Sequence, residues 1–281
     1  MRIQVGFDIT VQRHGPCALI LALGLRPEEE PRVEHLDALV LTPGTSTKPY
    51  IDSFGNRRLR IAEGTGPQRM QWNGVVQDDG LPDQLDPFAT GTPVYDLPQD
   101  VLEYLAPSRY CQSDLMMAEA WQRFGHIPAG WPRVKAVCDF VHQHIEFGYG
   151  YARPDKSAVD AFHETRGVCR DYAHLTITFC RALNIPARYV SGYLGDIGVP
   201  YAGPGDFCAW VEVFVGGVWR TVDARHNTPR IGRVKMVQGR DAVDVPMITS
   251  FGTIEMQSFT VWCDELAEDR QSMDQAHRRA G

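Results

Sequence analysis

Gly216-Gly217 is a pair of glycines between two segments in which apolar residues alternate. A two-residue Gly-Gly loop suits the tight turns whose twist matches that of antiparallel strands. We therefore expect a β-hairpin whose strands are residues 208–215 and 218–223. The turn also fixes the register, because it places Val215 opposite Val218. Few other features of the chain limit its fold as strongly.

The register of this hairpin predicts two different faces, because side chains alternate along a strand. One face carries small apolar side chains suited to burial: Ala209, Val211, Val213, Val215, Val218 and Val222. The other face mixes sulfur, aromatic and polar groups: Cys208, Trp210, Glu212, Phe214, Trp219, Thr221 and Asp223. On this second face Cys208 and Asp223 are diagonal neighbours within side-chain reach. That placement suits a base on the first strand and an orienting carboxylate on the second.

A cysteine begins a segment, residues 169–183, that reads as a buried helix with apolar residues at helical spacing. Asn184-Ile185-Pro186 ends it with a residue that tolerates the left-handed conformation and a helix-stopping proline. A thiol in the first turn faces unpaired backbone N–H groups and the positive end of the helix dipole, which stabilise a thiolate. Cys169 is therefore a candidate nucleophile. The alternative is a small hydrophobic residue in a core.

The composition limits the class of protein. The chain has 281 residues, of which 43% are hydrophobic and 22% charged, as in globular proteins that fold in water. A net charge of -7 disfavours nucleic acid and anionic membranes as partners. Seven cysteines without CxxC spacing argue against a disulfide framework and a structural zinc site. Without a signal-peptide pattern or a membrane-length apolar run, we expect a cytoplasmic protein.

The pattern of elements divides the chain into four regions. Residues 1–80 contain short strand-like segments between turns, which predicts a small N-terminal β-sandwich. Residues 81–98 are rich in Pro, Gly and Asp and are expected to be a linker. Residues 99–263 combine helices and strands in an α+β core domain. Residues 264–281 are charged and aperiodic, so we expect a poorly ordered polar tail.

Several motifs of the core domain occur together and in a recognisable order. They are residues 166–175 (RGVCRDYAHL), 185–193 (IPARYVSGY), 209–213 (AWVEV), Trp219 with Val222-Asp223, and 239–245 (GRDAVDV). In this order they resemble the core of the bacterial transglutaminase-like superfamily, over roughly residues 100–250. The resemblance implies a papain-like α+β fold, preceded by a β domain as in many members.

The resemblance also implies a catalytic triad of cysteine, histidine and aspartate. Carried over position by position, the nucleophile is Cys169 and the orienting acid is Asp223. The histidine immediately precedes the Ala-Trp pair, and Cys208 stands at that position. A thiol is a poor substitute, because its ordinary pKa is about two units above that of imidazole. Losing general acid–base catalysis costs typically ~100- to 10,000-fold in rate.

His226 is the candidate replacement base. If the strand ran on regularly, His226 would alternate onto the valine face, away from Cys208, so a bend after Asp223 is needed to bring it round. Besides the backbone N–H of Cys169, the donors proposed for an oxyanion hole are Tyr149 and Tyr151.

Two functions follow. The first is cysteine-dependent acyl transfer on an amide or peptide bond of a peptide or protein, by a protease or amidase rather than a cross-linking enzyme, without a cofactor. The second is an impaired or inactive family member that binds a peptide or protein. A thiol at position 208 adds two hypotheses: a disulfide between Cys169 and Cys208, or a soft metal held by Cys169, Cys208, Asp223 and His226. Neither the substrate nor the oligomeric state can be read from the sequence.

Overall fold

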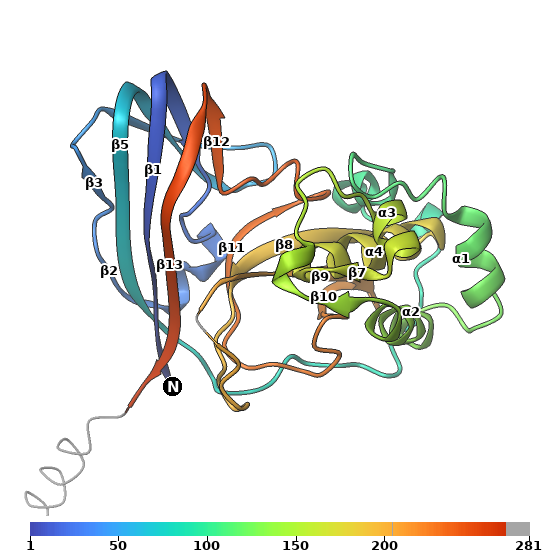
Figure 1. Ribbon diagram of the computed structural model, residues 1–281. Helices are drawn as coiled ribbons and strands as arrows, with labels where there is room; N and C mark the ends of the chain where they lie inside the picture. Colours follow the sequence, from blue (N-terminus) through green and yellow to red (C-terminus); the bar gives the residue numbers. More distant parts are fainter. Residues whose placement is uncertain (204, 268–281) are drawn as a thin grey trace, which may run out of the picture.

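The computed structural model describes residues 1–203 and 205–267, which form a β-sheet part and an α+β part side by side (Figure 1). The β-sheet part combines residues from the two ends of the described chain. The α+β part holds the helices and a second sheet. Within the described residues, no helix has the length and apolar character needed to cross a membrane.

The β-sheet part is one antiparallel sheet of seven strands, organised around two long neighbours, β1 and β5. Strands β2, β3 and β4 pair with the free side of β5, and β12 and β13 pair with the free side of β1. The strands are β1 (Arg2–Leu21), β2 (Val33–Leu36), β3 (Val40–Thr42), β4 (Thr47–Ile51), β5 (Arg57–Gln77), β12 (Ile248–Phe251) and β13 (Ile254–Leu266).

This arrangement differs from the sandwich expected over residues 1–80. The strands form one continuous sheet, and residues 248–266 complete it. The predicted boundary at 263 is too early, because β13 continues until Leu266 pairs with Arg2. The predicted tail otherwise falls on residues 268–281, which lie outside the described residues. A partner so distant in sequence leaves no local signal, since the alternation of a strand does not say which strand it pairs with.

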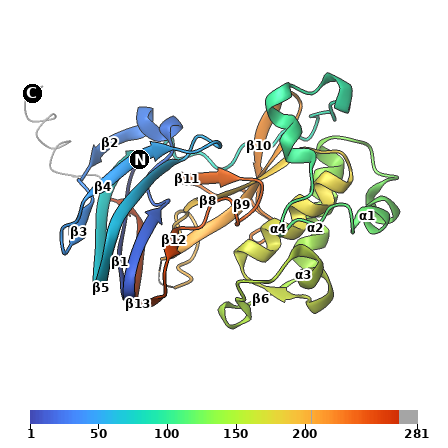
Figure 2. The ribbon, with the colours of Figure 1, turned by 90° about the horizontal axis from the view of Figure 1, so that it is seen from above.

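The α+β core is confirmed. Its sheet has the strand order β10-β9-β8-β11, and every neighbouring pair is antiparallel. The strands of this part are β6 (Glu146–Phe147), β7 (Arg166–Gly167), β8 (Ala187–Tyr193), β9 (Phe207–Val215), β10 (Val218–Val222) and β11 (Val234–Gly239). The helices are α1 (Met117–Phe124), α2 (Trp131–His144), α3 (Ala158–Glu164) and α4 (Cys169–Ala182). Helix α4 packs on β8 and β9, and the other three helices surround it (Figure 2).

The predicted hairpin register is confirmed. Val218 pairs with Val215, and the ladder continues to the pair of Val222 with Val211. Strand β9 is buried on both faces: its valines join the main core, while Cys208 packs on the opposite side. The two faces differ as the sequence predicts, although neither of them meets solvent along β9.

The two parts share one hydrophobic core. The ring of Phe7 on β1 meets that of Phe207 on β9 with centroids 6.4 Å apart. The side-chain amide of Asn56 donates to the carbonyl oxygen of Gln238 and its oxygen accepts from the backbone N–H of Gln238, both at 2.8 Å. Because apolar and polar contacts both cross the boundary, the sheet is fixed against the domain that carries Cys169.

Candidate active site

Cys169 is the first residue of α4, as predicted. Val168 before it is extended, and its backbone N–H donates to the carboxylate of Asp171 at 2.9 Å, which closes the first turn. Residues 171–182 are all buried, so the helix is held on every side. The thiol therefore lies at the N-terminus of a rigid helix, partly exposed, where the helix dipole favours a thiolate.

Cys169 on α4 packs against a small cluster formed by Val190, Cys208 and Trp210, with Cys208 on β9. The hydrogen bond that Cys208 donates holds the pKa of Cys169 below its ordinary value, and the backbone N–H of Ala209 and the charge of Arg225 act in the same direction. Burial opposes them. The same pairing raises the pKa of Cys208 well above its ordinary value, with burial adding to the effect. Of the two thiols, Cys169 is therefore the one that ionises more readily.

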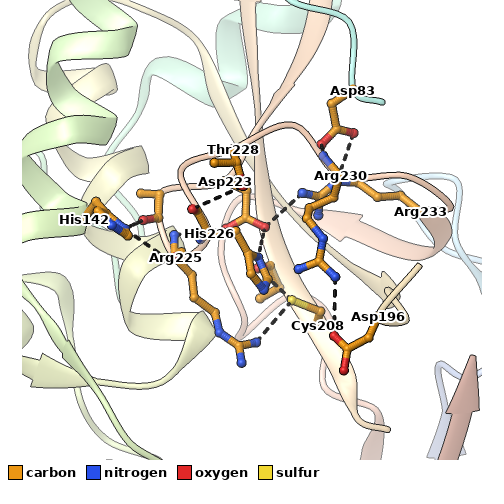
Figure 3. A network of polar contacts seen from close by, with 12 residues as sticks. Asp83, His142, Asp196, Cys208, Asp223, Arg225, His226, Thr228, Arg230 and Arg233 are labelled. Carbon is orange, nitrogen blue, oxygen red and sulfur yellow. Dashed lines mark hydrogen bonds and ion pairs between the residues drawn. The ribbon is translucent and has the colours of Figure 1, made fainter. Parts of the chain in front are cut away.

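A tight turn after β10 brings His226 to Asp223 (Figure 3). The Oδ1 atom of Asp223 accepts the backbone N–H groups of Arg225 at 3.0 Å and His226 at 3.3 Å. The backbone N–H of Asn227, in the left-handed region with φ 52°, donates to the carbonyl oxygen of Asp223 at 2.8 Å. This is the bend that the replacement hypothesis requires, so His226 leaves the side predicted for a regular strand.

The Nδ1 atom of His226 lies 2.8 Å from Oδ2 of Asp223. Since an ionised carboxylate only accepts hydrogen bonds, Nδ1 carries the proton and Nε2 is left as the basic nitrogen. One ring nitrogen of His226, the sulfur of Cys208 and an oxygen of Asp223 all lie within 4.8 Å of one another. Cys208, His226 and Asp223 therefore form one cluster, and Cys208 connects it to Cys169.

Asp223 is ionised although it is buried. Burial alone would raise its pKa, but the hydrogen bond from His226 and the charge of Arg233 together hold that pKa far below its usual range. Nη2 of Arg233 lies 2.9 Å from Oδ2 of Asp223, and its Nε atom lies 3.0 Å from both oxygens of Asp83. The linker that carries Asp83 thus fixes the cation that pairs with Asp223.

Arg225 is a site residue that the sequence reasoning missed. Its Nη1 atom lies 3.7 Å from the sulfur of Cys208, and its guanidinium carbon lies 4.0 Å from the centre of the Phe147 ring. An imidazolium normally supplies the positive charge beside a catalytic thiolate. The positive charge beside Cys208, which also lowers the pKa of Cys169, is here a guanidinium, and its charge does not depend on pH. The only sequence signal is its place in the turn that follows Asp223.

Replacing Arg225 by glutamine should slow alkylation of Cys169 at neutral pH on the order of 10-fold, because the thiolate loses a nearby positive charge. The measurement is the rate of iodoacetamide labelling, followed by peptide mass spectrometry. Arg220→Gln is the matched control, since Arg220 pairs with Asp86 elsewhere on the hairpin. Equal labelling rates in both variants would show that Arg225 does not stabilise the thiolate.

A cavity of ≈ 1010 Å³ opens beside these groups. Its walls come from the segment after β8, from the end of β13 and from the residues near η4 (Tyr149–Tyr151), and Cys208, Arg225 and His226 face it. Tyr149 lines this cavity. Tyr151 does not line it, and its hydroxyl donates to Glu146 at 3.2 Å. Of the two proposed oxyanion donors, only Tyr149 is placed to meet a bound substrate.

The same cluster has the ligand types of a metal site, but its charges disfavour a cation. Both oxygens of Asp223 already accept hydrogen bonds, and guanidinium groups contact Asp223 and Cys208. A metal ion would have to displace Arg233 and Arg225 from the atoms that it binds. The contacts favour a hydrogen-bonded network over a metal site.

Comparison with known proteins matches residues 122–224 to the model of the transglutaminase-like superfamily, a range that includes Cys169, Cys208 and Asp223 and ends just before His226. The crystal structure of a candidate cysteine protease from Cytophaga hutchinsonii superposes with a TM-score of 0.81 at 32% identity, covering 96% of this chain and 92% of that one. The uncharacterized protein ML0607 of Mycobacterium leprae is 31% identical over 146 residues, 51% of this chain. The match spans 52% of that relative, about half its length. From the fold, the site and these similarities, the chain belongs to the transglutaminase-like superfamily, with a papain-like α+β core.

Proposed function

We propose that this protein is a cysteine-dependent amide hydrolase, a protease or amidase, with Cys169 as the nucleophile. The observation that carries the proposal is the continuous series of contacts Cys169–Cys208–His226–Asp223. It supplies a thiolate, a proton donor beside it and a histidine oriented by a carboxylate. The family and the Cytophaga hutchinsonii structure support cysteine-dependent activity in general.

In the first step the sulfur of Cys169 attacks the carbonyl carbon, and the π electrons of the carbonyl move to its oxygen. The backbone N–H of Cys169 at the start of α4 and the hydroxyl of Tyr149 are the donors that we assign to this oxygen. Collapse of the intermediate breaks the C–N bond and leaves a thioester on Cys169.

Cys208 is suited to protonate the leaving amine at this moment. Its pKa is raised chiefly by the hydrogen bond to Cys169, with burial and the negative charge of Cys169 adding to the effect. Attack consumes that charge, so Cys208 becomes more acidic when the amine needs a proton. Cys208 is left as a thiolate beside His226, whose ring is oriented by Asp223.

The second step hydrolyses the thioester. The thiolate of Cys208 takes a proton from water, directly or by way of Nε2 of His226, the hydroxide attacks the acyl carbon, and Cys169 leaves as a thiolate. Cys208 is then a thiol again. The net reaction converts an amide and water to an acid and an amine. The cavity volume is at the upper end of the range of small-molecule pockets, about 300–1,000 Å³, which fits a peptide segment as substrate.

The experiment is the pH dependence of Cys169 alkylation in the wild type, His226→Ala, Cys208→Ser and Cys208→Ala. We expect an inflection below the ordinary thiol pKa of about 8.5 in the wild type. A serine at 208 keeps a hydrogen-bond donor and an alanine removes it, so the inflection should rise more in the alanine variant. An inflection that also changes in His226→Ala would identify the replacement base.

An ordinary thiol pKa for Cys169 in all four proteins would contradict the proposal. It would favour the alternative function, a family member that binds a peptide or protein in the cavity without turnover. The observation that favours this alternative is that Cys208 stands where the family has its histidine.

A further inference from the structure

Because position 208 holds a cysteine, Cys169 has a second thiol beside it, which a histidine at that position would not provide. A thiolate reacts with hydrogen peroxide, and a second thiol in contact with it can complete a disulfide. The side chain of Cys169 packs against the cluster of Val190, Cys208 and Trp210, and the interaction with Cys208 lowers the pKa of Cys169. We propose that Cys169 and Cys208 are a peroxide-sensitive dithiol, in which Cys208 closes a reversible disulfide on the nucleophile.

The remaining cysteines lack this chemistry. All seven lie within the described residues, and Cys169 alone among them is not fully buried. Burial raises the pKa of Cys111, Cys180 and Cys263 to about 12, and that of Cys138 well above its ordinary value. A buried neutral thiol reacts slowly with peroxide, so oxidation should begin at Cys169.

The two steps balance with peroxide as the oxidant. The thiolate of Cys169 attacks one oxygen of hydrogen peroxide, the O–O bond breaks, and the products are a sulfenic acid and hydroxide. The sulfur of Cys208 then attacks the sulfenic sulfur, the S–O bond breaks, and water leaves with the proton of Cys208. The two thiols lose two electrons, and peroxide gains them.

The surroundings favour both steps. Arg225 lies 3.7 Å from the sulfur of Cys208, and its charge stabilises the thiolate of Cys169. Cys169 is partly exposed and the cavity reaches Cys208, so a small oxidant has access to the pair. Forming the sulfenic acid removes the negative charge that raises the pKa of Cys208, so Cys208 ionises more readily when it has to attack. The inference shares the thiolate of Cys169 with the proposed function, but it does not require turnover of an amide.

The test is a non-reducing tryptic map of the full chain after treatment with one equivalent of hydrogen peroxide. Cleavage at arginine isolates Cys169 in residues 167–170 and Cys208 in residues 189–220, and neither peptide holds another cysteine. We expect these two peptides to be linked, with loss of iodoacetamide labelling at Cys169. Dithiothreitol should restore the labelling.

Cys208→Ser is the matched variant, because it keeps a hydroxyl in place of the thiol. It should give no link, and Cys169 should instead pass to sulfinic acid, which dithiothreitol does not reverse. Peroxide treatment of the chain unfolded in urea should give no preference for the 169–208 link. A folded wild type whose Cys169 is unmodified, or present as sulfinic acid without the link, overturns the inference.

The same data separate this inference from the proposed function. If the link forms while Cys169 shows an ordinary thiol pKa in the alkylation profile, the hydrolase proposal fails and the dithiol stands. If the pKa is low and depends on His226 but no link forms, the hydrolase proposal stands and the dithiol fails.

Discussion

Replacing Cys169 by alanine should lower kcat/KM for amide hydrolysis by at least about 1,000-fold, because the variant loses the proposed nucleophile, a partly exposed thiol at a helix N-terminus with a lowered pKa. The measurement is turnover of a fluorescence-quenched peptide library. Replacing Cys208 by alanine should reduce the rate less, within the ~100- to 10,000-fold range of general acid–base catalysis, since the nucleophile remains.

The comparison between these two variants also assigns the nucleophile. Cys208 faces the cavity, so the opposite order of effects would make Cys208 the attacking sulfur and Cys169 its partner. Cys17→Ala is the control for loss of a buried thiol, because Cys17 lies in β1, and it should keep the wild-type rate. If no peptide in the library is cleaved by the wild type, the binding function gains support.

Replacing Asp223 by alanine should lower the free energy of unfolding by about 3 kcal/mol or more, in the range found when one partner of a buried ion pair is removed. The side chain of Arg233 is 7% exposed, and after the substitution it would share a buried site with Asp83 as its remaining carboxylate partner. Urea denaturation followed by fluorescence measures the change. A loss below about 1 kcal/mol would mean that Asp83 alone compensates Arg233.

Acid should reduce the difference in the free energy of unfolding between the wild type and Asp223→Ala. The folded-state pKa of Asp223 lies below the unfolded value of about 3.9, so its ionisation stabilises the fold fully at neutral pH. That contribution is lost as the pH falls through the folded-state pKa. The gap in stability between the wild type and Asp223→Ala should thus be constant near neutrality and narrow in strong acid. The double variant Asp223→Ala/Arg233→Met, which removes the unpaired cation as well, should recover part of the loss.

The sequence was sufficient where the controlling interactions are local. The register of the β9–β10 hairpin depends on a two-residue turn and on the alternation of side chains, and both are visible in the chain. The start of α4 at Cys169 follows from helical spacing and a helix stop. The pairing of β13 with β1 joins segments from opposite ends of the described chain, so no local pattern could assign it.

In the site, too, the sequence was sufficient for residues placed by local interactions and insufficient for those placed by tertiary contacts. Cys169 and Asp223 could be placed from the sequence, because an element boundary fixes each of them. The direction of the His226 side chain depends on a turn in which Asp223 accepts hydrogen bonds from two backbone N–H groups. The alternation of side chains along a strand does not continue through such a turn. Arg225 and Arg233 were missed, because their roles come from contacts with Cys208 and Asp223 that only the folded chain makes.

The pairing of β1 with β13 also has a consequence during synthesis of the chain. Strand β1 leaves the ribosome long before its neighbour along Arg2–Arg13, which is translated only with residues 254–266. Until then residues 2–13 of β1 can pair with β5 alone, and their other edge offers unpaired backbone groups to any extended segment nearby. The wall that β13 contributes to the cavity is equally delayed. A nascent chain should therefore need protection of this edge, by a ribosome-associated chaperone for example, until β13 has been translated.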